Sequence, residues 1–549
     1  MNFIANESAK KLRGGYYTPP DLAVFLARWV KAINPRRLLE PSCGDGAFFA
    51  AFREVGGLSA ATITGFELDK KEAAKAVDRA REAGLKDVSI AAADFLQWAI
   101  KHLNDEMTRF DGVIGNPPFV RYQYLPAPFQ ARAEHIFGQL RLYFTKHTNA
   151  WVPFILASLA LLRPGGRLAM VVPAEIIHVM HAQSLRSYLG RECRRIVIID
   201  PEEIWFSDTL QGAVLLLAEK RVRAGDKAEG LAIYPVKGRE FLNRDPSDVF
   251  EEPRTINGTT VEGKWTRAIL DPETRTLIDQ LTEHPEVHRF KEVANVDVGI
   301  VTGANDYFLV TDEVVRRHHL QQWAHPMFGR SEHCPGIIYD PRQHEANARA
   351  GNPTNFLWFR EEAIGNNGAR AYIRRGEALS LHTRYKCRVR SPWYTVPSVY
   401  ATEIGMLKRA HDTPRLILNT LRAYTTDTAY RIRTLQSDAG RLVACFVNPL
   451  TALSAELEGR HYGGGVLELV PSEIERLMVP LPTKVNIDLA DLDKAIRTLP
   501  AHQVLAGQGR IVLGAMGLSA AKQERLLEGW RRLRDRRQRT PSNAVEHVA

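Results

Sequence analysis

The chain has 549 residues, more than one hydrophobic core usually spans, so we expect at least two domains. Hydrophobic residues make up 45% and charged residues 25%, proportions typical of a soluble globular protein and not of a disordered or membrane protein. The N-terminal segment lacks the apolar core of a signal peptide, and no uncharged apolar run reaches the roughly 18 residues that span a bilayer. We therefore expect a cytoplasmic protein without membrane contact.

Cysteine usage and net charge narrow the possible chemistry. The five cysteines are scattered and form no CxxC pair, so the sequence predicts neither a disulfide framework nor a zinc site, and we expect no metal. The formal net charge of +10 suits a polyanionic partner, because Lys and Arg that neutralise phosphates release counterions. Since many basic proteins bind no nucleic acid, this interpretation needs support from a recognisable site.

The first 220 or so residues alternate short apolar runs with amphipathic segments, the pattern of a parallel sheet covered by helices. The predicted strands, all short apolar runs, are 36–42, 61–69, 88–95, 110–118, 166–174, 194–201 and 212–220. The predicted helices, each with one apolar face, include 21–33, 70–84 and 149–162. The sequence therefore predicts a doubly wound, Rossmann-like α/β domain over residues 1–225.

The composition changes after the last of these strands. Charged stretches interrupted by Pro and Gly, at 221–230 and 243–260, are typical of a connecting region. A second, mixed α+β domain is predicted over 245–505. A C-terminal helical or basic tail is predicted over 506–549, where six arginines surround Trp530 in either a helix or a mobile arm.

The first predicted strand leads into a helix through the glycine-bearing turn LEPSCGDG, at 39–46. Gly44 and Gly46 would let a ligand approach the backbone where a side chain would clash. Some folds with such a turn bind nothing, so the turn alone leaves a cofactor role open. Neither a G-x-x-x-x-G-K-[ST] phosphate loop nor a strict G-x-G-x-x-G occurs, which argues against ATP and NAD.

Acidic residues follow the next two predicted strands, at the edge where open α/β sheets bind ligands. Glu67 is placed to accept both hydrogen bonds of a ribose diol. Asp94 could accept from an adenine amino group while Phe95 packs on the ring. Glu67 could instead be a helix N-terminal charge and Asp94 a helix cap. Three such features in series nevertheless favour a cofactor that contains a nucleoside.

The fourth predicted strand runs directly into Asn116, Pro117, Pro118 and Phe119. The two prolines fix φ and prevent further strand pairing, so the Asn side chain and the nearby carbonyls are held rigidly at the strand end. An isolated N-P-P would be a strand-terminating turn. After the preceding features we interpret it as a preorganised acceptor site.

These motifs, in this order, resemble those of the gamma-class, TaqI-type N6-adenine DNA methyltransferases of type II restriction-modification systems. The matching segments are GGYYTPPDLA, LEPSCGDG, FELD, ADF, NPPF, a late strand region at 161–177 and a base-pocket segment at 202–217. The resemblance is specific over the first 220 residues. It is looser beyond them, although 299–310, 390–397 and 459–482 resemble segments of target-recognition domains. Phe119 replaces the more frequent Tyr and keeps the stacking face.

The resemblance implies a class I methyltransferase fold and an enzyme that transfers a methyl group from S-adenosyl-L-methionine to N6 of an adenine. The adenine would be flipped out of a short duplex recognition sequence. Its methylation would protect the DNA from a cognate restriction enzyme. Asn116 and the carbonyl of Pro117 would accept the two N–H bonds of the amine. Phe119 and Phe206, with Trp205 as the fallback for Phe206, would stack on the base. The implied catalytic set is Asn116, Pro117, Pro118 and Phe119. The implied cofactor-binding set is Tyr17, Thr18, Glu40, Pro41, Ser42, Gly44, Gly46, Glu67, Leu68, Asp94, Phe95, Asn116 and Pro118.

The resemblance also implies that the second domain recognises the base sequence of double-stranded DNA. The protein would act as a monomer, associated with the nucleoid in a bacterial cytoplasm. Cys43 beside the glycine turn is expected only to pack. Three alternatives remain: a methyltransferase that modifies RNA bases or protein glutamine with the same N-P-P-[YF] motif, a bifunctional enzyme that also cuts DNA, and an inactive DNA-binding module. The recognition sequence and the residues that read bases do not follow from the sequence.

Overall fold

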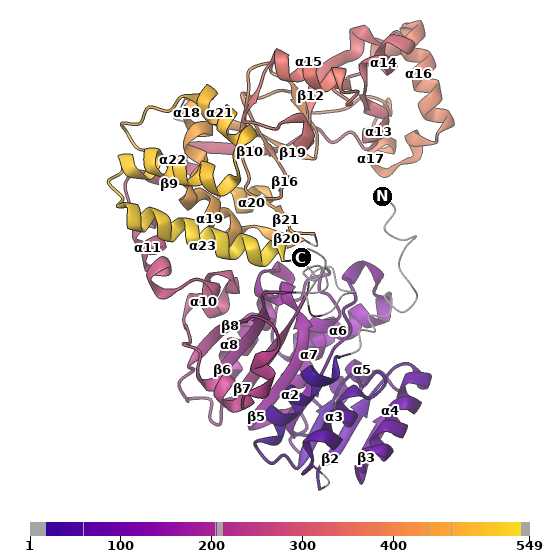
Figure 1. Cartoon of the computed structure of the whole chain (residues 1–549). Helices are drawn as coiled ribbons and strands as arrows, with labels where there is room; N and C mark the ends of the chain where they lie inside the picture. The colour runs from indigo at the N-terminus through magenta and orange to yellow at the C-terminus, as the bar shows by residue number, and fades with distance from the viewer. Residues whose placement is uncertain are drawn as a thin grey trace, which may run out of the picture. The chain divides into compact units, whose positions relative to one another are not determined.

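The computed structural model describes residues 18–58, 60–203, 205, 212–435, 438–462 and 464–539. These residues form two compact units (Figure 1). The first unit comprises the described residues through Ile269 together with Arg539, and the second comprises Leu270–Gln538. Within these ranges, no helix combines the length and the apolar composition that a bilayer crossing needs.

The described part of the first unit is built on one eight-stranded sheet with the order β3-β2-β1-β4-β5-β7-β6-β8. Its strands are β1 (Arg37–Glu40), β2 (Thr62–Phe66), β3 (Asp87–Ala91), β4 (Phe110–Gly115), β5 (Leu162–Pro173), β6 (Cys193–Pro201), β7 (Ala213–Lys220) and β8 (Gly230–Val236). β1 to β7 match the predicted strands. The expectation of a parallel sheet is wrong at β7, which is antiparallel to β5 and β6. Only 11 residues lie between Pro201, where β6 ends, and Ala213, where β7 begins, whereas a parallel crossover needs about a dozen or more.

Helices cover both faces of this sheet, as a doubly wound fold requires. α2, α3 and α4 pack in one row, and α5, α6, α7 and α8 pack in another (Figure 1). α9 packs against α2. The helices are α2 (Pro20–Lys31), α3 (Ala47–Val55), α4 (Lys70–Glu82), α5 (Phe95–His102), α6 (Ala127–Gln139), α7 (Trp151–Ala160), α8 (Gln183–Glu192), α9 (Pro246–Glu251) and α10 (Thr259–Glu262). α4 begins where Asp69 accepts hydrogen bonds from the backbone of Lys71 and Glu72.

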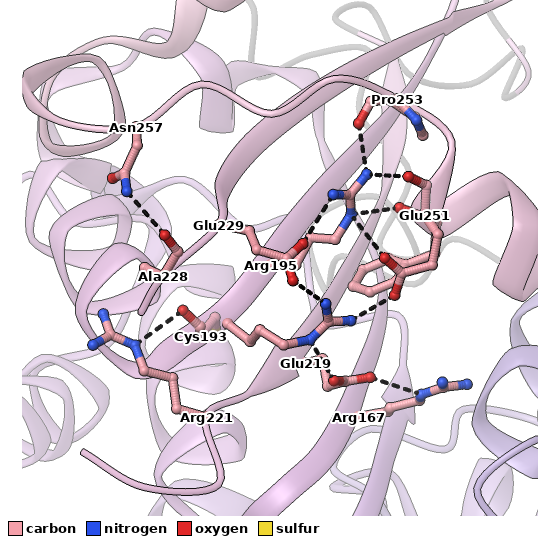
Figure 2. Close-up of polar contacts among 12 residues, drawn as sticks. Arg167, Cys193, Arg195, Glu219, Arg221, Ala228, Glu229, Glu251, Pro253 and Asn257 are labelled. Atoms are coloured by element: carbon pink, nitrogen blue, oxygen red, sulfur yellow. Dashed lines mark hydrogen bonds and ion pairs between the residues drawn. The ribbon is translucent and has the colours of Figure 1, made fainter. Parts of the chain in front are cut away.

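The first unit extends past the expected boundary at residue 225, because the connecting segment packs on the sheet edge. β8 pairs in parallel with β6. The side chain of Arg195, on β6, is 7% exposed and pairs with Glu229 at 3.0 Å. It also donates to the carbonyls of Phe250 at 2.7 Å, Glu251 at 2.7 Å and Pro253 at 2.6 Å, as the contacts in Figure 2 illustrate. These partners lie 34 to 58 residues from Arg195 in the chain, so local composition could not reveal them.

The second unit combines several small sheets with helices. Its strands are β9 (Val287–Arg289), β10 (Ala294–Val298), β11 (Leu309–Val310), β12 (Ala324–Phe328), β13 (Ile338–Tyr339), β14 (Asn355–Leu357), β15 (Ile404–Leu407), β16 (Arg409–Ala410), β17 (Leu416–Asn419), β18 (Tyr424–Thr425), β19 (Ala429–Thr434), β20 (Arg460–Tyr462), β21 (Val466–Glu468) and β22 (Met478–Pro480). The largest sheet described has the order β10-β19-β15-β17-β13.

The helices of the second unit are α11 (Pro272–Thr282), α12 (Phe290–Val293), α13 (Asn305–Phe308), α14 (Asp312–Arg317), α15 (Pro341–Arg349), α16 (Asn367–Ala378), α17 (Tyr385–Arg388), α18 (Ala439–Phe446), α19 (Pro449–Glu458), α20 (Pro471–Ile474), α21 (Leu489–Thr498), α22 (Ala501–Ala515) and α23 (Ala520–Gln538). α23 packs on α19 and contains most of the arginine-rich segment. Its Trp530 is fully buried, and its Arg537 pairs with buried Glu456 at 2.6 Å. Through Gln538 the expected tail is therefore an integral part of this unit.

Replacing Arg195 tests this assignment of the boundary. Arg195→Ala leaves buried carbonyls without a donor, at about 1–3 kcal/mol for each unsatisfied group. We expect the free energy of unfolding of the first unit to fall by about 3 kcal/mol or more, measured by urea denaturation. The exposed Arg223 supplies the control, since Arg223→Ala should change the free energy of unfolding by less than about 0.5 kcal/mol. Equal stabilities of the two variants would contradict the assignment.

Candidate active site

The glycine turn and the N-P-P motif meet where β1 and β4 end side by side. The hydroxyl of Ser42, just after β1, donates to the backbone carbonyl of Asn116, just after β4, at 2.9 Å. The amide nitrogen of the Asn116 side chain donates to the hydroxyl of Thr18 at 3.2 Å. Asn116 is half-buried, and Pro117 is buried. The sheet order thus brings together three predicted site residues from distant parts of the chain.

Glu67, at the end of β2, is tied to the same turn. One carboxylate oxygen accepts from the backbone N–H of Gly44 at 2.9 Å, and the other accepts from that of Asp69 at 2.9 Å. Each carboxylate oxygen retains acceptor capacity beyond one hydrogen bond. The side chain of the neighbouring Leu68 is 72% exposed.

The two glycines of the turn have different roles. Gly44 has a φ of +53°, and a Cβ placed on it would meet no atom within 4 Å, so the space beside it is open. Gly46 has a φ of +89°, and a Cβ there would lie 2.9 Å from the Cα of Ala76 on α4. Gly44 therefore fits the expected approach of a ligand. Gly46 instead permits close packing of two helices.

Glu40 is a buried carboxyl group, and no described residue forms an ion pair with it. It is 0% exposed, and within the described part of the chain neither carboxylate oxygen has a hydrogen-bond partner. Burial, with the nearby charges of Asp45 and Glu67, raises the pKa of Glu40 well above its usual value. A buried acceptor without a partner fits a ligand that supplies a positive charge or N–H donors. S-adenosyl-L-methionine carries both an ammonium and a sulfonium, so the residues present fit the expected cofactor.

The thiol beside this turn packs as expected. Cys43 is buried, and its Sγ lies 3.6 Å from the carbonyl oxygen of Glu40. Burial raises the pKa of the Cys43 thiol well above its usual value, which disfavours the thiolate that a nucleophile needs. Among the described residues, no three His, Cys, Asp or Glu side chains are grouped to hold a metal ion.

The structure gives Asp94 and Phe95 local structural roles. Asp94 caps α5 by accepting from the backbone of Gln97 at 3.1 Å, and its other oxygen pairs with Arg132 at 2.7 Å. Phe95 is only 2% exposed, and its ring centroid lies 5.6 Å from that of Phe66. The expected contacts of these two residues with an adenine ring stay predictions, and an Asp94 contact would add to or replace its present bonds.

The aromatic residues expected to hold a base differ in placement. Phe119 is half-buried and packs against the core cluster that contains α2 and α3. Trp205 is 7% exposed and stacks on Phe241, with ring centroids 5.6 Å apart and planes inclined by 15°. Its ring is part of the core, and its fallback role in stacking on the base stays a prediction. Phe206 and Tyr17 lie outside the described residues.

A buried network that the sequence did not reveal supports the chain after the N-P-P motif. The backbone N–H of Tyr122 donates to the side-chain oxygen of Asn149 at 3.0 Å. The amide nitrogen of Asn149 and the indole of Trp151 both donate to one oxygen of Glu175, at 2.8 and 2.9 Å. The only signal in the sequence was an acidic residue within the apolar run VVPAEII.

Comparisons with known proteins point to DNA modification enzymes. Two family models match, the Eco57I restriction-modification methylase over residues 47–206 and the C-terminal domain of the type II methyltransferase M.Eco57I over residues 262–513. The type II methyltransferase M.AccI of Acinetobacter calcoaceticus is 24% identical over 509 residues, which cover 89% of this chain and 88% of that protein. M.TthHB8I of Thermus thermophilus, also a type II methyltransferase, is 30% identical over 231 residues, or 41% of this chain and 47% of that protein.

Among solved structures, the type IIG restriction endonuclease BpuSI matches with a TM-score of 0.42 at 15% identity, over 96% of this chain and 66% of that one. The first unit has the Rossmann-like class I methyltransferase fold, with β7 as its antiparallel strand. The chain is thus similar to type II restriction-modification methyltransferases along most of its length.

The raised pKa of Glu40 predicts a pH-dependent stability. In the ligand-free protein the folded chain holds this proton to a higher pH than the unfolded chain, so stability falls as pH rises from the usual carboxyl pKa through the raised one. Glu40→Gln removes this dependence. We expect the variant to melt above the wild type at pH 8, by a margin that shrinks toward pH 5. The exposed Glu54 serves as control, and the same margin in Glu54→Gln would contradict the interpretation.

Proposed function

We propose that the chain is a site-specific DNA methyltransferase that transfers a methyl group from S-adenosyl-L-methionine to N6 of an adenine. The target adenine is rotated out of a short duplex sequence, and its methylation protects DNA from a cognate nuclease. The observation that carries the proposal is the hydrogen bond from Ser42 to Asn116, which places the acceptor motif against the glycine turn. The similarity to type II methyltransferases supports the same reaction class.

Residues at the ends of β1 and β2 would hold the donor. The buried carboxylate of Glu40 offers its acceptor oxygens to a cationic group, and the open space at Gly44 admits the ligand to the backbone. Glu67 would accept hydrogen bonds from a ribose diol, and the exposed side chain of Leu68 would cover a purine ring. When bound, S-adenosyl-L-methionine supplies a methyl group activated by its sulfonium charge.

Asn116 would prepare the adenine amine for attack. The lone pair of N6 is delocalised into the ring, so the amine is a weak nucleophile until its hydrogens are held. The amide nitrogen of Asn116 donates a hydrogen bond to the hydroxyl of Thr18, and this bond sets the orientation of the Asn116 amide oxygen. That oxygen and the carbonyl of Pro117 would accept the two N–H bonds and turn the lone pair toward the donor. This is catalysis by orientation and charge stabilisation, without a covalent intermediate.

The target base must leave the helix to reach this site, at a cost of a few kcal/mol. Stacking on an aromatic ring is worth roughly 1–3 kcal/mol per base, so Phe119 would offset much of that cost. Phe206 remains the proposed second stacking residue. Sequence recognition would fall to the second unit, most of which matches the C-terminal domain of a type II methyltransferase. We propose a monomer acting on double-stranded DNA in the bacterial cytoplasm.

Methyl transfer from tritiated donor into DNA, RNA and protein tests the function. We expect label in duplex DNA, located at N6 of adenine by nucleoside analysis and in its sequence context by single-molecule sequencing. Asn116→Ala should lower kcat by about 100-fold or more while duplex binding persists. The exposed Asn104 provides the control, because Asn104→Ala should behave as the wild type. Label in RNA, protein or cytosine would refute the proposal.

The network around Glu175 predicts a positioning effect on the same reaction. Glu175→Ala leaves the amide of Asn149 and the indole of Trp151 without their acceptor and loosens the backbone at Tyr122. We expect kcat to fall about 10- to 100-fold with donor affinity within about twofold of the wild type. Glu175→Gln should recover most of the activity, because its side-chain oxygen still accepts both bonds. A parallel loss in both variants would exclude this positioning role.

A further inference from the structure

A short helix of the second unit carries an exposed group of basic, aromatic and apolar side chains. The α17 patch consists of Val301, Arg384, Tyr385, Lys386, Arg388 and Val389. Tyr385 and Val389 are each 65% exposed, and Val301 is 36% exposed. Exposed large apolar side chains that gather at one place mark interaction surfaces.

The charge of the patch is not compensated locally. From Arg370 to Arg390 the chain has seven Arg or Lys residues and one carboxylate, that of Glu377. Among the described residues, no carboxylate forms an ion pair with any of the three cations of the patch. Some other exposed arginines of this unit are paired with a carboxylate, for example Arg422 with Glu403 at 2.6 Å. The patch is therefore a site of net positive charge.

The aromatic ring of the patch lies among its cations. The Nζ of Lys386 lies 5.6 Å from the ring centroid of Tyr385, and the guanidinium carbon of Arg388 lies 5.5 Å from it. Cation–π attraction at these distances holds the charges near the ring while they stay in water. Basic residues interleaved with an aromatic ring suit a sugar-phosphate backbone, because the cations neutralise phosphate and the ring covers apolar sugar surface.

The patch is also fixed in place. Arg390 donates to the carbonyls of Thr302 at 2.8 Å and Val301 at 2.6 Å, which joins α17 to the loop that follows β10. Gly303 has a φ of +80°, and a Cβ on it would lie 2.8 Å from the Cβ of Lys386, so the loop and the helix are in close contact. The side chain of Cys387 is fully buried between them. A surface that is rigid before binding loses little conformational entropy on binding.

We infer that the α17 patch binds the phosphate backbone of double-stranded DNA. The partner follows from charge complementarity together with the proposed function, on which this inference rests. Lys386 and Arg388 each contact a phosphate and add to affinity without reading sequence, and Tyr385 packs against the sugars between them. The patch thereby anchors the second unit to the duplex in which the target adenine lies.

Fluorescence anisotropy of the full chain with a labelled mixed-sequence DNA duplex, over a series of salt concentrations, tests this surface. We expect Lys386→Ala/Arg388→Ala to raise the Kd roughly 10-fold and to make the slope of log affinity against log salt less negative by about two. Tyr385→Ala should weaken binding without changing that slope. Arg342→Ala/Arg349→Ala removes the same charge from exposed positions on α15 and should leave both quantities unchanged. Donor binding should be the same in every variant.

The outcomes separate this inference from the proposed function. If the wild type methylates DNA but the Lys386/Arg388 variant keeps the wild-type Kd and salt slope, the patch assignment is wrong and the proposed function stands. If the wild type methylates no DNA but the Lys386/Arg388 variant still binds the duplex more weakly than the Arg342/Arg349 control, the α17 patch is a DNA-binding surface and the proposed function is wrong. Tighter binding of an RNA duplex of the same sequence, or no binding of DNA by the wild type, overturns the assignment of the partner.

Discussion

The hydrogen bond from the Ser42 hydroxyl to the Asn116 carbonyl is the contact on which the site depends. It exists because β1 and β4 are parallel neighbours whose ends lie at one edge of the sheet. The same edge places Glu67 on the backbone of Gly44 and Thr18 on the amide of Asn116. The groups proposed to bind the donor and those proposed to hold the adenine amine therefore share one frame, in which they need little rearrangement to meet.

That frame contains an unfavourable feature in Glu40, whose buried carboxyl group has no hydrogen-bond partner in the part of the chain that the structure describes. A fold selected for stability alone would place an apolar residue there, because removing a charge from water is costly. A ligand with a positive charge would make burial of the Glu40 carboxylate favourable, since this acceptor is already desolvated and in place. The cost of burying Glu40 and the proposed binding of a cationic donor thus have the same physical origin, namely a carboxyl group removed from water.

Arginines serve opposite purposes in different parts of this chain. Arg195 and Arg537 are buried, and their guanidinium groups satisfy backbone carbonyls and carboxylates that would otherwise lack donors. The cations of α17 are exposed and unpaired with any carboxylate in the described ranges. A net charge of +10 therefore does not measure affinity for DNA. Only the burial and pairing of each cation decide whether it stabilises the fold or remains available to phosphate.

Local pattern was sufficient to predict β1 to β7, the glycine turn and the Asn116 motif, because apolar runs, glycine turns and prolines act over a few residues. It did not predict the direction of β7, the membership of β8 in the first unit, the burial of Trp205, the pairing of Asp94 with Arg132 or the network of Glu175. Each of these depends on a partner far along the chain. The sequence by itself determined which groups are available for chemistry, and the tertiary structure decided which of them meet, because long-range packing and burial select the partner of every polar group.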